Sequence, residues 1–257
     1  MVIAWLAPRV WVPALDAGGE FGFDLGLDAD LRGVIAVGLD LQLVAGGGPN
    51  ERWHLDVYTR AETTVRSNRA DESPVRISPE HIGYPVGARL RFELAPDREW
   101  GPFIFHRSEH DIDLDEASLN RETLAYETYG VDLRLRSEER RGRVALAMVY
   151  DRGTRLDGTR QKRPFEYSFG ALEAGGTTGL WGPSYASGWI FALGRVASPW
   201  ADISGHLEVG ARKRGIEGDA RLFLRLARFA NYQHLEDPAR HLLLLGIGLG
   251  DDLVTGP

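Results

Sequence analysis

The sequence predicts an all-β protein, specifically a closed antiparallel transmembrane β-barrel of about 12 strands. Apolar and polar residues alternate with a two-residue period from about Phe21 to Leu249, whereas no apolar stripe with helical spacing reaches a comparable length. Most of these runs contain ten or more residues. A tilted membrane strand needs about 9 to 11 residues, whereas strands of soluble proteins centre on roughly 5 to 6. The length of the runs therefore favours a barrel that crosses a bilayer.

Glycine, proline, asparagine and charged clusters divide this alternation into twelve expected strands. Each has an apolar and a polar face; Leu55 and Val57, for example, alternate with Asp56, Tyr58 and Arg60. The segments 88–94, 131–136 and 202–209 repeat the pattern. In chain order, the expected strands span residues 20–31, 34–45, 52–65, 83–95, 100–111, 120–137, 143–152, 165–174, 187–197, 201–214, 219–231 and 241–250.

We expect one folded domain, because no linker or abrupt change of charge divides the chain. Residues 1–19 would form an N-terminal extension and residues 20–252 the barrel. Periodicity alone does not say which face points inward, so a soluble two-sheet sandwich with packed apolar faces is the alternative fold.

Closure of twelve strands would leave a polar, hydrated interior, because a barrel of this size is too wide for side chains to fill. Five tryptophans near strand ends would mark the lipid headgroup levels: Trp53, Trp100, Trp181, Trp189 and Trp200. The short connections 30–33, 137–142 and 198–200 would form one rim. The longer connections 67–80, 151–163 and 173–186 would form the other, extracellular rim.

Composition narrows the function classes. The formal charge of −7 is spread over intermixed Arg, Asp and Glu, so there is no continuous basic surface and nucleic acid is not an expected partner. The chain has no cysteine, which excludes disulfides and thiolate chemistry. No stretch reaches the roughly 18 consecutive apolar residues of a helical span, so any crossing must be made by strands. We expect a location in the bacterial outer membrane, in contact with its lipid and lipopolysaccharide.

Chemistry is suggested by Phe103-Ile-Phe-His-Arg-Ser-Glu-His110, followed by Ser118-Leu-Asn-Arg121. If the chain turned around Leu114, an antiparallel register would place Ser108 opposite Asn120 and His106 opposite Glu122. These four side chains would then share one face within about 5 to 8 Å. Ser108 would be a nucleophile, His106 its general base, and Asn120 or Glu122 would fix the imidazole tautomer.

This segment resembles the active-site segment of the outer-membrane phospholipase A family, whose fold is a twelve-stranded barrel of about this length. The resemblance covers some twenty residues. It implies a calcium-dependent phospholipase that is active as a dimer, with His106, Ser108 and Asn120 as its catalytic residues and Asp113 near a calcium position. The family's Asn-Gly after the serine is replaced here by Glu109-His110.

A second resemblance covers more of the chain. The segments Pro8-Arg-Val-Trp-Val-Pro13 and His106-Arg-Ser-Glu-His-Asp111 are similar to an uncharacterised outer-membrane family with a His-x-Ser-Ser-His element. That resemblance implies a location rather than a chemistry.

Three alternatives stay open at this point. His106, Ser108, His110 and Glu122 could belong to a structural polar network inside the barrel, because Asn120 shares its parity with the polar side chains of Asp132 and Arg134. Asp111, Asp113 and Asp115 alternate at a hairpin tip, so they form either a calcium site or a solvated acidic turn. If His106 and Ser108 form a catalytic site, the protein is a hydrolase of phospholipid or lipid A acyl esters. Otherwise it would be a non-catalytic barrel that passes small solutes or anchors an envelope complex, with selectivity set by Arg89, Arg91, Arg134 and Arg136.

Overall fold

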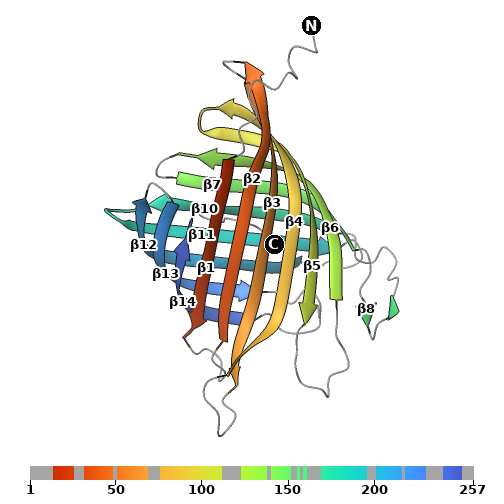
Figure 1. Cartoon of the computed structure of the whole chain (residues 1–257), viewed down its shortest axis with the longest axis vertical. Coiled ribbons are helices and arrows are strands. Elements are labelled where there is room, and N and C mark those ends of the chain that lie inside the picture. Colours follow the sequence, from red (N-terminus) through yellow and green to blue (C-terminus); the bar gives the residue numbers. More distant parts are fainter. Residues whose placement is uncertain are drawn as a thin grey trace.

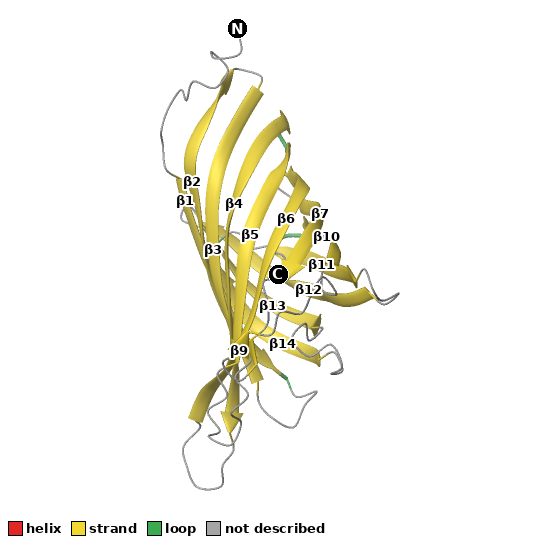
Figure 2. Cartoon of the chain, turned by 90° about the vertical axis from the view of Figure 1, so that its right-hand side faces the viewer, coloured by secondary structure: helices red, strands yellow, loops and turns green. Residues whose placement is uncertain are grey.

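A computed structural model describes most of the chain, namely residues 14–25, 32–48, 51–68, 76–111, 123–137, 140–151, 155–156, 159–160, 169–195, 201–215, 218–229 and 240–250. Strand is the regular element throughout these residues (Figure 2). None of the described segments forms a helix that could span a membrane.

Twelve long strands match the twelve expected ones in order. They are β1 (Ala14–Asp24), β2 (Arg32–Gly48), β3 (Glu51–Asn68), β4 (Arg76–Ala95), β5 (Arg98–Asp111), β6 (Thr123–Arg136), β7 (Arg140–Asp151), β10 (Phe169–Gly179), β11 (Ser184–Arg195), β12 (Ala201–Gly215), β13 (Gly218–Phe229) and β14 (Arg240–Leu249). Two short strands, β8 (Arg155–Leu156) and β9 (Thr159–Arg160), pair with each other between β7 and β10. Because β1 begins at Ala14, it includes residues that the sequence assigned to the extension.

Hydrogen bonding closes the sheet into a barrel. Each long strand pairs antiparallel with its neighbours along the chain, and β1 pairs with β14 from Gly19↔Leu249 to Asp24↔Leu244. Figure 1 shows β1 to β5 on the near side of this wall and β7 and β10 to β13 crossing behind them. Since no sheet edge is left among the long strands, the fold is a closed 12-stranded antiparallel β-barrel and not a two-sheet sandwich.

The two rims differ in the length of their connections. The connections 49–50, 96–97, 137–139, 180–183 and 216–217 lie on one rim, which also carries the start of β1 and the end of β14. We call it the short-turn rim. The connections 25–31, 69–75, 112–122, 152–168, 196–200 and 230–239 join strands at the other rim, the long-connection rim. Short turns are periplasmic and longer loops extracellular in barrels of this kind.

Three connections lie on a different rim from the one that their length in the sequence suggested. Residues 30–33 and 198–200 belong to the long-connection rim, and the expected long loop 173–186 is a tight turn. In that turn the Leu180 N–H donates to the Ser184 carbonyl, and Gly182 takes a positive φ of 55°. Strands β10 and β11 thus extend further than the glycine-rich segment 175–179 suggests, because glycine is tolerated inside a paired strand.

The outer wall is apolar. Exposed large apolar side chains follow the outward positions of the strands, as on β7, where Val144, Leu146, Met148 and Tyr150 are half exposed or more. Leu133 and Leu207 are 48% and 68% exposed. In a soluble barrel these apolar side chains would face the centre, whereas here they face outward. This belt fits the hydrocarbon of a bilayer, as the alternation predicts.

The interior is polar, charged and filled. Inward-facing side chains from all sides of the barrel are less than a tenth exposed, including Asp56, Arg89, Arg91, Arg107, Asp132, Glu173, Glu208 and Arg225. Other inward-facing side chains, such as Asp40 and Glu62, keep about a quarter of their surface exposed, so the interior is packed unevenly. Long guanidinium side chains and aromatic rings reach across the space that a strand count alone would leave to water.

Glycines on neighbouring strands make room for the inward-facing rings. Phe103 lies directly opposite Gly130, Tyr185 opposite Gly210 and Phe223 opposite Gly246. Trp189 lies opposite Gly175 in the same way, and its indole N–H donates to Glu173 at 3.2 Å. Trp189 is thus an interior residue and not part of an aromatic girdle, whereas Trp100 and Trp181 are exposed, as expected.

Candidate active site on the outer wall

His106 and Ser108 point outward from β5. Their neighbours in sequence, Phe105 and Arg107, are buried in the interior, and the outward-facing Ile104 is 42% exposed. The interpretation of His106 and Ser108 as part of an interior network is therefore wrong, because β5 keeps a strict alternation through this segment. A histidine and a serine stand two residues apart on the lipid-facing side, with Cα atoms about 7 Å apart.

Glu127 on β6 is the partner of His106. The two residues lie directly opposite each other, and the His106 Nδ1 to Glu127 Oε1 distance is 3.0 Å. An ionised carboxylate only accepts hydrogen bonds, so Nδ1 is the donor in this contact. Glu127 is only 6% exposed although it faces outward, since neighbouring side chains cover it. A buried carboxylate in an apolar wall is costly and marks a functional site by default.

Tyrosines and apolar side chains surround this pair. In the register of the wall, Val86 lies beside His106, and Tyr150 lies beside Glu127 on the opposite side. Tyr84 is paired with Ser108, and Tyr84, Tyr129 and Tyr150 are all about half exposed. Tyrosine is enriched where lipid headgroups meet acyl chains. Three half-exposed tyrosines thus lie around His106, Ser108 and Glu127, which we call the outer-wall triad.

The register corrects the expected third member of the site. A turn around Leu114 would have placed Ser108 opposite Asn120 and His106 opposite Glu122, but Ser108 pairs with Ala125 and His106 with Glu127. Asn120 and Glu122 lie outside the described residues. The sequence held one signal for Glu127: it is a charged residue at the same parity as the outward Tyr129, Val131 and Leu133.

The expected calcium ligands are not placed. Asp111 ends β5 three positions after Ser108, with only its backbone described, and Asp113 and Asp115 lie outside the described residues. Within the described segments no group of three or more His, Cys, Asp or Glu side chains could hold a metal ion.

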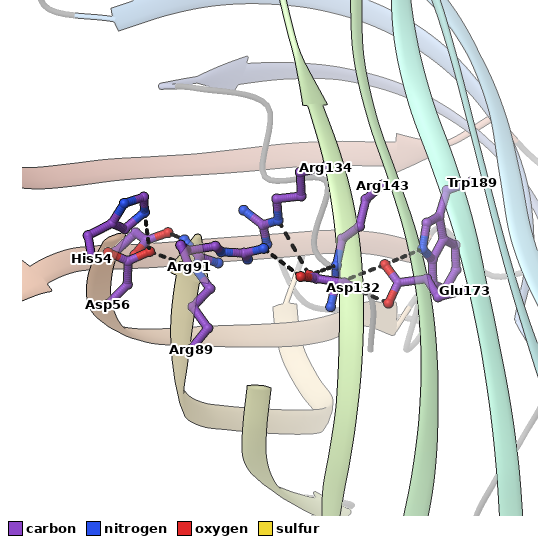
Figure 3. Close-up of polar contacts among 10 residues, drawn as sticks. His54, Asp56, Arg89, Arg91, Asp132, Arg134, Arg143, Glu173 and Trp189 are labelled. Carbon is purple, nitrogen blue, oxygen red and sulfur yellow. Dashed lines mark hydrogen bonds and ion pairs between the residues drawn. The ribbon is translucent and has the colours of Figure 1, made fainter. Parts of the chain in front are cut away.

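The interior carries a second group of charged residues, below the outer-wall triad towards the short-turn rim. Three arginines converge on Asp132 (Figure 3): Arg91 Nη1 donates to Oδ1 at 2.5 Å, Arg143 Nε donates to Oδ2 at 2.7 Å, and Arg134 Nε lies 3.5 Å from Oδ2. Arg143 also donates to both oxygens of Glu173. Beside them, Arg89 forms ion pairs with Asp40 and Asp56.

Known proteins resemble the chain in fold only distantly. No family model and no curated protein matches it. Among solved structures, the β-domain of the Bordetella autotransporter Brka aligns at 10% identity and a TM-score of 0.45, covering 92% of this chain and 98% of that one. The KdgM porin aligns at 7% identity and 0.44 over the same shares, and Pseudomonas putida OprB at 8% and 0.38, over 92% and 90%. Neither family resemblance expected from the sequence is tested by these matches.

The strand arrangement of this chain and the character of its two faces define the class of protein. A closed ring of strands with an apolar exterior, a charged interior and unequal rims is a transmembrane β-barrel of the bacterial outer membrane.

Proposed function

We propose that the protein is an outer-membrane serine esterase that hydrolyses acyl esters of membrane lipids at the outer-wall triad. The observation that carries this proposal is the outward-facing His106–Glu127 pair, with Ser108 two residues from the histidine on the same face. A serine hydroxyl is unreactive without a base, and an imidazole held in one tautomer by a carboxylate is such a base.

The chemistry would proceed in two balanced steps. The Ser108 Oγ attacks the ester carbonyl carbon while its proton moves to His106 Nε2, and collapse of the adduct breaks the ester bond and returns that proton to the leaving alkoxide. A water molecule then attacks the acyl-serine with His106 again as base, releasing a fatty acid and regenerating the hydroxyl. Glu127 would stabilise the imidazolium that forms in each step.

The position of the triad supports a lipid as the substrate. A lipid ester lies where headgroup and acyl chain meet, which is the level that Tyr84, Tyr129 and Tyr150 mark on this wall. Below the triad the outward positions are apolar down to Trp100, six residues or roughly 20 Å along β5. An acyl chain could lie along this surface while its carbonyl stays beside Ser108.

The test is release of fatty acid from mixed micelles of phospholipid, or of lipid A, by the full chain in detergent with calcium present. We expect Ser108→Ala to lower the rate by about a thousandfold or more, and Glu127→Gln by roughly a hundredfold or more, because each removes a part that the others depend on. Thr178→Ala is the matched control, since Thr178 is an exposed hydroxyl residue on β10 whose Oγ hydrogen-bonds only its own strand. Its rate should equal that of the unchanged protein.

A fluorophosphonate probe gives a second readout that does not depend on the lipid chosen. It should label the unchanged protein and the Thr178→Ala variant, but not the Ser108→Ala variant. Undiminished fatty acid release by Ser108→Ala, or equal labelling of all three proteins, would remove the proposal.

Calcium belongs to the same proposal. Asp111 ends the strand that carries Ser108, Asp113 and Asp115 follow it in the sequence, and carboxylate oxygens are the ligands that Ca²⁺ prefers. We expect a calcium chelator to abolish the release of fatty acid. Dimer formation, which the phospholipase A resemblance implies, is measured in the same micelles by the size of the complex with and without calcium.

The charged interior favours a second candidate function, a pore for small solutes or a scaffold for an envelope complex. Arg89, Arg91 and Arg134 do face the interior, as the pore alternative requires. Their close packing opposes free passage at this level, and single-channel recording separates the two functions.

A further inference from the structure

We propose that the short-turn end of the barrel interior binds a soluble oxyanion of the phosphate type, held by Arg91, Arg134 and Arg136. This site is separate from the outer-wall triad, because its residues face the interior of the barrel.

Like charges face each other where β6 meets β7. Arg134 lies directly opposite Arg143, and Arg136 lies directly opposite Arg141. Directly opposed like charges destabilise an antiparallel pair. Two such pairs in succession concentrate positive charge at the short-turn end of the interior.

The carboxylates nearby do not satisfy these arginines fully. Asp132 serves three of them, and Glu173 is taken up by Arg143. Glu99, opposite Arg134 across β5 and β6, and Glu93, opposite Glu99 across β4 and β5, are the further carboxylates described at this level, and Glu93 pairs with Arg52.

Arg91 is the decisive residue. Its side chain is 1% exposed, and one of its nitrogens, Nη1, donates to Asp132. Within the described residues its Nε and Nη2 have no hydrogen-bond partner, and neither does Arg134 Nε. Unsatisfied guanidinium N–H groups in a buried place are costly. Arg91 and Arg134 both point towards Asp132 in Figure 3, so one anion between them could accept from both.

The anion would enter from the short-turn rim. Arg136 is exposed at the end of β6, and Arg134, two residues deeper, keeps 16% of its side chain exposed. The ligand therefore need not pass through the filled part of the interior. A phosphate group fits this set because its oxygens match the fork of a guanidinium in two directions at once.

Thermal unfolding of the full chain in neutral detergent micelles tests the site, with inorganic phosphate compared against chloride at equal ionic strength. We expect phosphate to raise Tm with a saturable dependence on concentration. In the double variant Arg134→Gln/Arg136→Gln, the Kd taken from this dependence should rise roughly tenfold or more, since two charge-assisted contacts are lost. Arg98→Gln is the control, and it matches the single variant Arg136→Gln: each removes one positive charge from the same rim, where Arg98 is 63% exposed beside Asp97.

Equal responses to phosphate and chloride would overturn the proposal, and so would an equal weakening by Arg98→Gln and by the double variant. If the double variant fails to fold, Arg136→Gln alone serves, because that side chain is exposed and carries little of the packing. It should still weaken phosphate binding several-fold, and an unchanged Kd would count against the site.

Discussion

Single carboxylates in this barrel hold together several strands at once. Asp132 on β6 contacts Arg91 of β4 and Arg143 of β7, and Glu20 on β1 accepts from Arg221 and Arg225 of β13. Removing one such acid leaves several guanidinium groups buried without a counter-charge, which costs more than the loss of an ordinary hydrogen bond.

Asp132→Asn should therefore destabilise the barrel by about 3 to 5 kcal/mol. The measurement is urea unfolding in lipid vesicles, followed by tryptophan fluorescence. Asp97→Asn is the control: Asp97 is 44% exposed in the β4–β5 turn, and its pairing with Arg98 is worth less than about 1 kcal/mol. Equal effects of the two variants would show that Asp132 is not a structural centre.

The sequence predicts which residues share a face of a strand, because that depends only on their spacing. It does not predict which residues of the next strand lie opposite them, because that depends on the register. His106 and Ser108 were brought to one face by their spacing alone. Glu127 was not found, because the partner of His106 depends on how many residues the 112–122 connection takes up, and a two-residue period carries no information about that number.

Pairing of strands places interior rings over glycines. A Cβ built on Gly130 would lie 2.5 Å from Phe103 Cζ and 2.7 Å from the Leu146 carbonyl oxygen. A glycine beneath a ring from the neighbouring strand lets the ring lie flat against the wall. The twelve strands could be predicted in order from alternation, whereas these ring and glycine pairs could not, since they require the register between strands.

Gly130→Ala should cost about 1 to 3 kcal/mol, because Phe103 or the backbone of β7 must move. Gly170→Ala on β10 is the control, since a Cβ there would meet no atom within 4 Å. Urea unfolding of both variants under identical conditions measures the difference. If Gly130→Ala is as stable as Gly170→Ala, the ring does not depend on the glycine.

At the scale of the whole molecule, the sequence predicts which side chains face the interior and which face the lipid. It does not predict how much of the interior those side chains occupy. Alternation identified the apolar belt because each side chain points to one face or the other. It said nothing about volume, and the interior is closed at the described levels by arginines, acids and rings such as Phe105, Tyr126 and Phe191. Strand number alone overestimated the space left for water.

We therefore expect the protein to show no stable single-channel conductance in planar bilayers. Many inward-facing side chains are buried against one another in the described part of the barrel, which opposes a wide water path. Discrete conductance steps that change size in Arg134→Gln would instead support the pore as the function of the protein. A silent bilayer is the result that agrees with an enzyme whose chemistry takes place on the outer wall.

The pairing of β1 with β14 has a consequence for biogenesis. Glu20 and Arg225, which secure this seam from within, are separated by 205 positions, so the ring can be completed only after almost the entire polypeptide has been delivered. Until then the incomplete sheet has two unpaired edge strands and an exposed apolar face, and both features promote aggregation. The periplasmic transit of this polypeptide should accordingly depend on a holding chaperone until its last strand docks against its first.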